Sequence, residues 1–86
     1  MSYRVEHSVA YYKPLIAAAT TKEELNKISY AAFMEDSAPI CKSVLSNRVD
    51  ALCMLREVEL GFLPNSPRYV AALKKQAATG KNPMFA

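Results

Sequence analysis

The sequence predicts an all-α protein, a small bundle of three to four helices around one long central helix at about residues 38–61. Apolar residues recur three and four positions apart, which is the spacing of an amphipathic helix. Helix start and stop signals flank these periodic segments. With 86 residues, of which 51% are hydrophobic, the chain has room for one globular domain. We expect this domain over residues 1–80, with a short tail at 81–86.

The central helix is the segment with the most large apolar side chains. Ser37 is a candidate N-cap, Pro39 fits the first turn, and Gly61 followed by Pro64 ends the helix. At 100° per residue, one broad arc collects most of its apolar residues, and the opposite side is polar, with Cys53 among its residues. The arc consists of Ile40, Cys41, Val44, Leu45, Ala51, Leu52, Leu55, Val58 and Phe62.

A line with alternating spacings of four and three also runs along this helix, as in a seam that docks against another helix. It joins Cys41, Leu45, Arg48, Leu52, Leu55 and Glu59. Arg48 and Glu59 are charged where apolar side chains are expected, and a buried guanidinium needs a partner. Arg48 either reaches water or an internal carboxylate, or it meets an acidic group of a partner protein. The internal carboxylates that we consider are Glu24, Glu35 and Asp36.

The segment before the central helix contains two shorter elements. Residues 1–12 are ambiguous between strand-like alternation and a helical stripe. Pro14 is expected in the first turn of a short helix over residues 14–19, because proline is poorly tolerated deeper in a helix. Thr21 and Glu24 then form a capping box, which predicts the start of the next helix.

That next helix has one apolar face, widened by three larger side chains. The face consists of Leu25, Ile28 and Ala32, and the larger side chains are Tyr30, Phe33 and Met34. We favour a core position for the three larger side chains. The alternative is an exposed patch that binds a partner.

The last helix is bounded by Ser66 as N-cap, Pro67 at its first position and Gly80 at its end. Its expected buried side consists of Tyr69, Val70, Leu73 and Ala77. Cations cluster toward the C-terminus, with one aromatic residue among them. Arg68, Tyr69, Lys74, Lys75 and Lys81 are therefore the candidate nucleic-acid contacts.

No residue pattern predicts catalysis, a cofactor or a metal. The chain lacks glycine-rich phosphate loops, and His7 is its only histidine. Cys41 and Cys53 are twelve residues apart on one helix, about 18 Å at 1.5 Å per residue, so they cannot bridge to each other. We therefore expect a protein that is not an enzyme, without catalytic, cofactor-binding or metal-binding residues.

Charge and cysteine usage bear on partners and location. The net charge is +3 and the pI is about 9.0, which permits acidic proteins or nucleic acid as partners. Two unpaired thiols indicate a reducing compartment. There is no basic and then apolar leader, and no apolar run of membrane-spanning length. We expect a soluble cytoplasmic protein without a membrane partner.

The order of a short helix, a capped helix, a long helix, a proline-containing connector and a final short helix is similar to that of the haemolysin-expression modulators, which bind a nucleoid protein. The positions with like residues are Thr21, Leu25, Ser37, Leu52, Leu55 and Leu60. These are capping and core positions. Val49, with Asp50 next to it, stands where that family has an acidic residue in its long helix. The resemblance implies a topology and no binding residues.

The absence of catalytic patterns leads to three functional hypotheses. The first is a small protein-binding module, a regulator or inhibitor of bacterial or phage type that docks onto a larger protein. Its candidate interface residues are Arg48, Glu59, Tyr30, Phe33 and Met34. The alternatives are a nucleic-acid-associated accessory factor, or modulator of a nucleoid or transcription protein, and a homo-oligomeric structural subunit.

Overall fold

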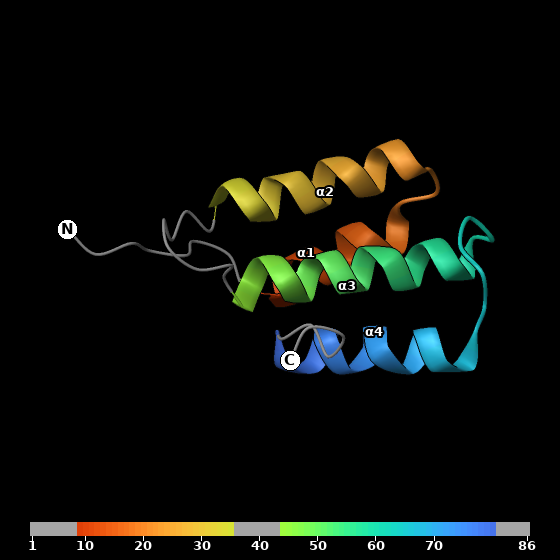
Figure 1. The fold of residues 1–86 in the computed structure, drawn as a ribbon. Helices are drawn as coiled ribbons and strands as arrows, with labels where there is room; N and C mark the ends of the chain where they lie inside the picture. Colours follow the sequence, from red (N-terminus) through yellow and green to blue (C-terminus); the bar gives the residue numbers. More distant parts are fainter. Residues whose placement is uncertain (1–8, 36–43, 81–86) are drawn as a thin grey trace.

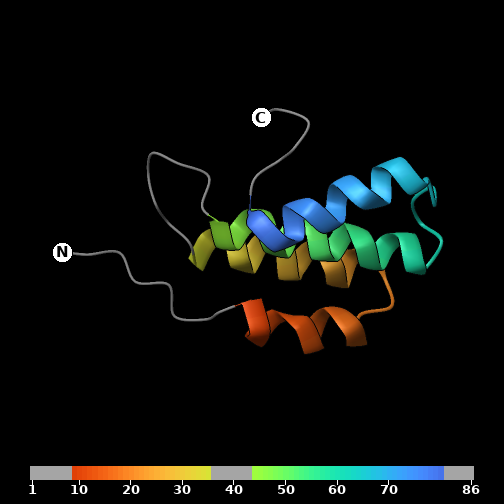
Figure 2. The same ribbon diagram turned by 90° about the horizontal axis from the view of Figure 1, so that it is seen from below.

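The computed structural model describes residues 9–35 and 44–80, and four α-helices make up most of these ranges. They are α1 (Val9–Ala18), α2 (Lys22–Glu35), α3 (Val44–Glu59) and α4 (Pro67–Thr79). Helices α2, α3 and α4 lie side by side with α3 in the middle (Figure 1), and α1 lies against one face of this layer (Figure 2). The predicted all-α bundle around a central helix is confirmed. None of the helices in these ranges is long and apolar enough to cross a membrane.

Helix α1 begins earlier than the sequence predicts. Pro14 lies inside the helix, five residues after Val9, rather than in its first turn. The expected start at Pro14 was wrong because the stripe of Val9, Tyr12 and Ile16 is buried and stabilises the earlier turns. The bond that Pro14 cannot donate would go to the carbonyl of Ala10, and both residues are exposed, so water can replace it.

The capping box at the start of α2 is confirmed. The amide of Glu24 donates to Thr21 Oγ1 over 3.1 Å, and Glu24 Oε1 accepts from the Thr21 hydroxyl over 3.1 Å and from the Thr20 amide over 3.2 Å. These bonds lower the pKa of the Glu24 carboxyl, the Thr20 amide contributing most, because they favour its charged form. The predicted apolar face is also confirmed, since Leu25 and Ala32 are fully buried.

The larger side chains of α2 are exposed, in contrast to the core position that we favoured. Tyr30, Phe33 and Met34 retain 64%, 59% and 56% of their accessible surface. Tyr30 and Met34 lie on the side of α2 opposite Leu25 and Ala32, Phe33 lies beside that face, and α2 contacts α1 and α3 only. Apolar side chains outside the face that neighbouring helices cover remain exposed.

Helix α3 is apolar around more of its circumference than one arc, because it contacts all three other helices. Val49 is fully buried and Cys53 is 3% exposed, so the expectation that Cys53 lies on the polar side was wrong. Burial raises the pKa of the Cys53 thiol to about 12, with Asp50 and Glu57 adding to the shift. The predicted start at Ser37 and Pro39, and Cys41, lie outside the described residues.

Gly61 ends α3 in the predicted way. It has φ 85°, a left-handed conformation that favours glycine. The amide of Phe62 donates to the carbonyl of Glu57 over 2.8 Å, and that of Gly61 to Val58 over 3.1 Å, which is the Schellman pattern. The turn sends the chain back along α3.

Helix α4 has the predicted bounds. Ser66 is the N-cap by position, although its side chain makes no capping hydrogen bond, and Pro67 begins the helix. Gly80 has φ 76° and donates its amide to the carbonyl of Gln76 over 2.8 Å. Leu73 and Ala77 are buried as expected, and so is the side chain of Gln76, which the apolar pattern could not indicate.

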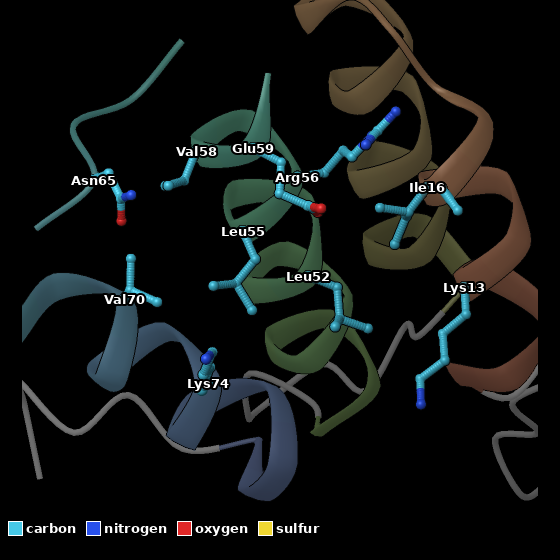
Figure 3. Close-up of a pocket in the computed structure, with 11 residues that line it drawn as sticks. Lys13, Ile16, Leu52, Leu55, Arg56, Val58, Glu59, Asn65, Val70 and Lys74 are labelled. Carbon is cyan, nitrogen blue, oxygen red and sulfur yellow. The ribbon is translucent and has the colours of Figure 1, made fainter. Parts of the chain in front are cut away.

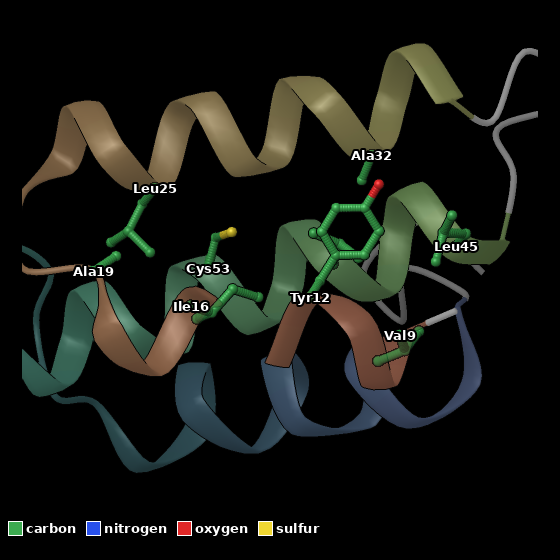
Figure 4. Packing of buried hydrophobic residues seen from close by; sticks show 9 residues of the cluster. Val9, Tyr12, Ile16, Ala19, Leu25, Ala32, Leu45 and Cys53 are labelled. Atoms are coloured by element: carbon green, nitrogen blue, oxygen red, sulfur yellow. The ribbon is translucent and has the colours of Figure 1, made fainter. Parts of the chain in front are cut away.

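The core has two clusters that share α3. The first lies between α1, α2 and α3 (Figure 4) and comprises Val9, Tyr12, Ile16, Ala19, Leu25, Ala32, Leu45, Val49 and Cys53. The second lies between α3 and α4 and comprises Ala51, Leu73 and Ala77, with half-buried neighbours that include Leu55 and Val58. Leu52 packs against both clusters.

Candidate binding groove

A groove of about 630 Å³ lies over α3, between α1 and α4 (Figure 3). It is lined by Lys13, Ile16, Ala17, Leu52, Leu55, Arg56, Val58, Glu59, Asn65, Val70 and Lys74. Its volume is within the range of small-molecule and peptide-anchor sites.

The packing of the helices explains why this groove is open. Helices α1 and α4 both contact α3, but they do not contact each other. The part of α3 that faces the gap therefore remains only partly covered. Its floor consists of Leu52, Leu55 and Val58, which are half-buried and three residues apart. Such a stripe runs along the helix axis for about 9 Å at 1.5 Å per residue.

The charges of the groove are distributed unevenly. Lys13 from α1 and Lys74 from α4 come from opposite walls near Leu52, whereas Glu59 lies toward the other end (Figure 3). Lys13, Lys74 and Glu59 are exposed, and none of them has an ion pair among the described residues. Three of the four charged lining residues are cations, because Arg56 also lines the groove.

Arg56 has an additional structural role. Its Nε donates to the carbonyl oxygen of Ala19 over 3.1 Å, just after the end of α1. A cation is favourable at a helix C-terminus, where carbonyl groups lack partners within the helix. The bond holds α1 against α3 and fixes one end of the groove wall.

Arg48 does not line the groove. Its Nε donates to the carbonyl oxygen of Ala77 near the end of α4 over 2.7 Å. Two further bonds join the same parts of α3 and α4: Asn47 Nδ2 donates to the Gly80 carbonyl over 2.8 Å, and Gln76 Nε2 donates to the Asn47 carbonyl over 3.0 Å. The internal partner of Arg48 is thus a backbone carbonyl, and Glu24 bonds to its own capping residues instead. Asp36 lies outside the described residues.

The other candidate interface residues lie in different places. Glu59 is on the groove, whereas Tyr30, Phe33 and Met34 form an exposed patch on α2, which contributes no lining residue. The sequence-based set is therefore divided between an internal contact, the groove and the α2 patch. The involvement of each in binding stays a prediction.

The candidate nucleic-acid residues are also divided. Lys74 lines the groove, and Tyr69 packs against the α3–α4 cluster. Arg68 and Lys75 are exposed and seven positions apart, which places them on a common face of α4. Lys81 lies outside the described residues. Nucleic-acid binding by this set stays a prediction.

Of the groove residues, Glu59 and Lys74 were candidate binding residues from the sequence, and the others were not. Lys13, Ala17 and Asn65 belong to segments whose pairing with α3 depends on the tertiary arrangement. A partial signal existed for α3, because its apolar arc is broader than one neighbouring helix can cover.

The described residues contain no group of three or more side chains suited to hold a metal ion. Cys53 is the free cysteine within them, and its raised pKa keeps it in the thiol form, which is a poor nucleophile. The side chains that line the groove offer mainly apolar contact and charge.

The fold and groove define an all-α bundle with an open interhelical site. Comparisons with protein-family models, with curated proteins and with solved structures found no match to this chain. The topological similarity to the haemolysin-expression modulators accordingly has no support from them.

Proposed function

We propose that this chain is a small non-enzymatic binding module, a regulator or inhibitor that docks onto a larger protein through the groove between α1 and α4. The observation that supports this proposal is the partly covered stripe of Leu52, Leu55 and Val58 on the central helix. Apolar stripes between helices are typical sites for the apolar face of another helix.

The position of the groove between two helices that do not contact each other suits one inserted element. Its walls are helices, its floor is apolar, and its charged groups stand at the rim. Binding interfaces commonly combine an apolar centre with a polar rim. The partner contributes the apolar side chains that cover the floor.

The experiment uses the full chain as bait in lysate of its source organism, with quantitative mass spectrometry of the retained proteins. Ala17 lines the groove and is exposed, so Ala17→Trp places a large ring in the groove without disturbing the core. Ala18 is the next residue and is exposed, but it does not line the groove, so Ala18→Trp is the matched control.

We expect at least one protein to be retained by wild type and by Ala18→Trp. The amount retained by Ala17→Trp should be lower by tenfold or more. The same protein, once purified, should bind the wild-type chain directly. Its Kd should be close to the wild-type value for Ala18→Trp and much higher for Ala17→Trp. Recovery of no specific protein, or equal retention by both variants, would contradict the proposal.

A further inference from the structure

We propose that the groove accepts an amphipathic helix whose acidic side chains are gathered at one end, next to Lys13 and Lys74. This inference rests on the proposed function and specifies the chemistry of the partner. It follows from two properties of the groove: the spacing of its floor and the placement of its charges.

The floor suits a helix. Leu52, Leu55 and Val58 form ridges along α3, and a docked helix presents apolar side chains at i, i+3 or i+4, and i+7 to such ridges. The stripe is about 9 Å long, which corresponds to about two turns of the incoming helix. Helices α1 and α4 supply walls along both sides of it.

The charges select acidic residues at one end. The ammonium groups of Lys13 and Lys74 come from opposite walls toward the same end of the groove (Figure 3). Neither is paired with a carboxylate among the described residues, so both can pair with a partner without breaking an existing bond. Two cations on either side of a helix attract acidic side chains there.

The other end has no excess of positive charge, because Arg56 and Glu59 both line it (Figure 3). Glu59 is exposed at that end and lies seven residues, or about 10 Å, along α3 from Leu52. A carboxylate of the partner at that end meets Glu59 as well as Arg56, so it gains less than a carboxylate next to Lys13 and Lys74. A partner with acidic residues at both ends should therefore bind less tightly than one with the same number at the lysine end. The lysines also attract the negative end of the macrodipole of the docked helix when its C-terminus lies next to them.

The test measures the affinity of fluorescent helical peptides for the full chain by anisotropy. The peptides share an apolar face and carry either glutamates at the C-terminal end, the same number of glutamates at both ends, or glutamines in their place. We expect the first peptide to bind about threefold to tenfold more tightly than the glutamine peptide, as two exposed charge contacts predict, and to lose this preference at high salt.

Lys74→Glu should remove most of this preference. Lys75→Glu is the matched control, because it changes the net charge equally on an exposed side chain that does not line the groove. Glu59→Lys should raise the affinity of the peptide with glutamates at both ends. Equal binding of all peptides, or equal effects of Lys74→Glu and Lys75→Glu, would overturn the inference.

The peptide data also separate this inference from the proposed function. One outcome is that all peptides bind equally well whatever their charge, and that Ala17→Trp weakens their binding whereas Ala18→Trp does not. The groove then binds helices but does not prefer acidic ones. The inference alone then fails. If no peptide binds, or if Ala17→Trp has no effect, the proposed function fails with it.

Discussion

Arg48 Nε donates to the carbonyl oxygen of Ala77 over 2.7 Å and thereby joins the central helix to the end of α4. This carbonyl belongs to the last turn of α4, where helix carbonyls lack partners within the helix. A charged residue that interrupts the apolar seam of α3 is thus used to cap a neighbouring helix.

We expect Arg48→Met to destabilise the fold by about 1–2 kcal/mol, because the Ala77 carbonyl loses the charged donor of a partly buried hydrogen bond. The methionine keeps most of the apolar stem, so packing changes little. Arg48→Lys keeps the charge but not the Nε donor, and it should recover only part of the loss. Urea unfolding of the three proteins measures these differences. An Arg48→Met protein as stable as wild type would show that the bond contributes nothing.

Glu24 should make stability depend on pH in the acid range. Its pKa is lowered from 4.5 in the folded state by the Thr20 amide and the Thr21 hydroxyl, so its stabilising effect is present above 4.5 and is lost as the pH falls through the folded value. Glutamine can still act in a capping box but does not titrate. We expect wild type to exceed Glu24→Gln in stability at pH 7 and this advantage to disappear at pH 2.

Urea unfolding at both pH values, on wild type and Glu24→Gln, is the appropriate measurement. Glu23→Gln is a matched control, because Glu23 lies in the same first turn of α2 but accepts none of the capping bonds. The same pH dependence in Glu24→Gln as in wild type would rule out this carboxylate as its source.

The positions of Phe33 and Leu25 on α2 predict opposite effects of truncation. Phe33 is 59% exposed, so Phe33→Ala should change stability by less than about 0.5 kcal/mol, and the better helix propensity of alanine favours the variant. Leu25 is fully buried, so Leu25→Ala should cost about 2–4 kcal/mol. A large loss for Phe33→Ala in denaturant unfolding would place this ring in a core or an interface.

The Cys53 thiol should resist modification in the folded protein. It is 3% exposed and its pKa is raised to about 12, so both access and thiolate are lacking at pH 8. In a Cys41→Ser background, we expect a disulfide reagent to label Cys53 slowly in buffer and rapidly in urea. Rapid labelling in buffer, with intact helical circular dichroism, would show that the α1–α2–α3 cluster opens easily.

Local signals predicted much of the fold. Thr21 with Glu24, and Gly80, act through hydrogen bonds within a few residues, and Pro67 acts through its fixed φ. The sequence alone therefore indicated where α2 begins and where α4 begins and ends. Pro14 and Cys53 were misplaced because burial against neighbouring helices outweighed a local preference. No periodicity in one segment reveals how many helices will cover it.

The groove could not be predicted from local signals, because it is formed by the tertiary arrangement of the helices. Lys13 and Lys74 are 61 positions apart, and only the packing of α1 and α4 on α3 brings them to one end of the same site. Glu59 was singled out from the sequence because it is charged within a helical seam, and it does line the groove. Exposure of the α2 patch was the alternative to a core position, and it follows from the limited contacts of α2.

Helix α4 contacts only α3 among the described helices, so its attachment depends on a single interface. That interface is the most extensive between any two of these helices, and three side-chain hydrogen bonds of Asn47, Arg48 and Gln76 reinforce it. A partner seated between α1 and α4 would bridge two helices that otherwise do not meet. Its binding would then slow amide exchange in α4 more than in α2, and occupancy would make unfolding more nearly all-or-none.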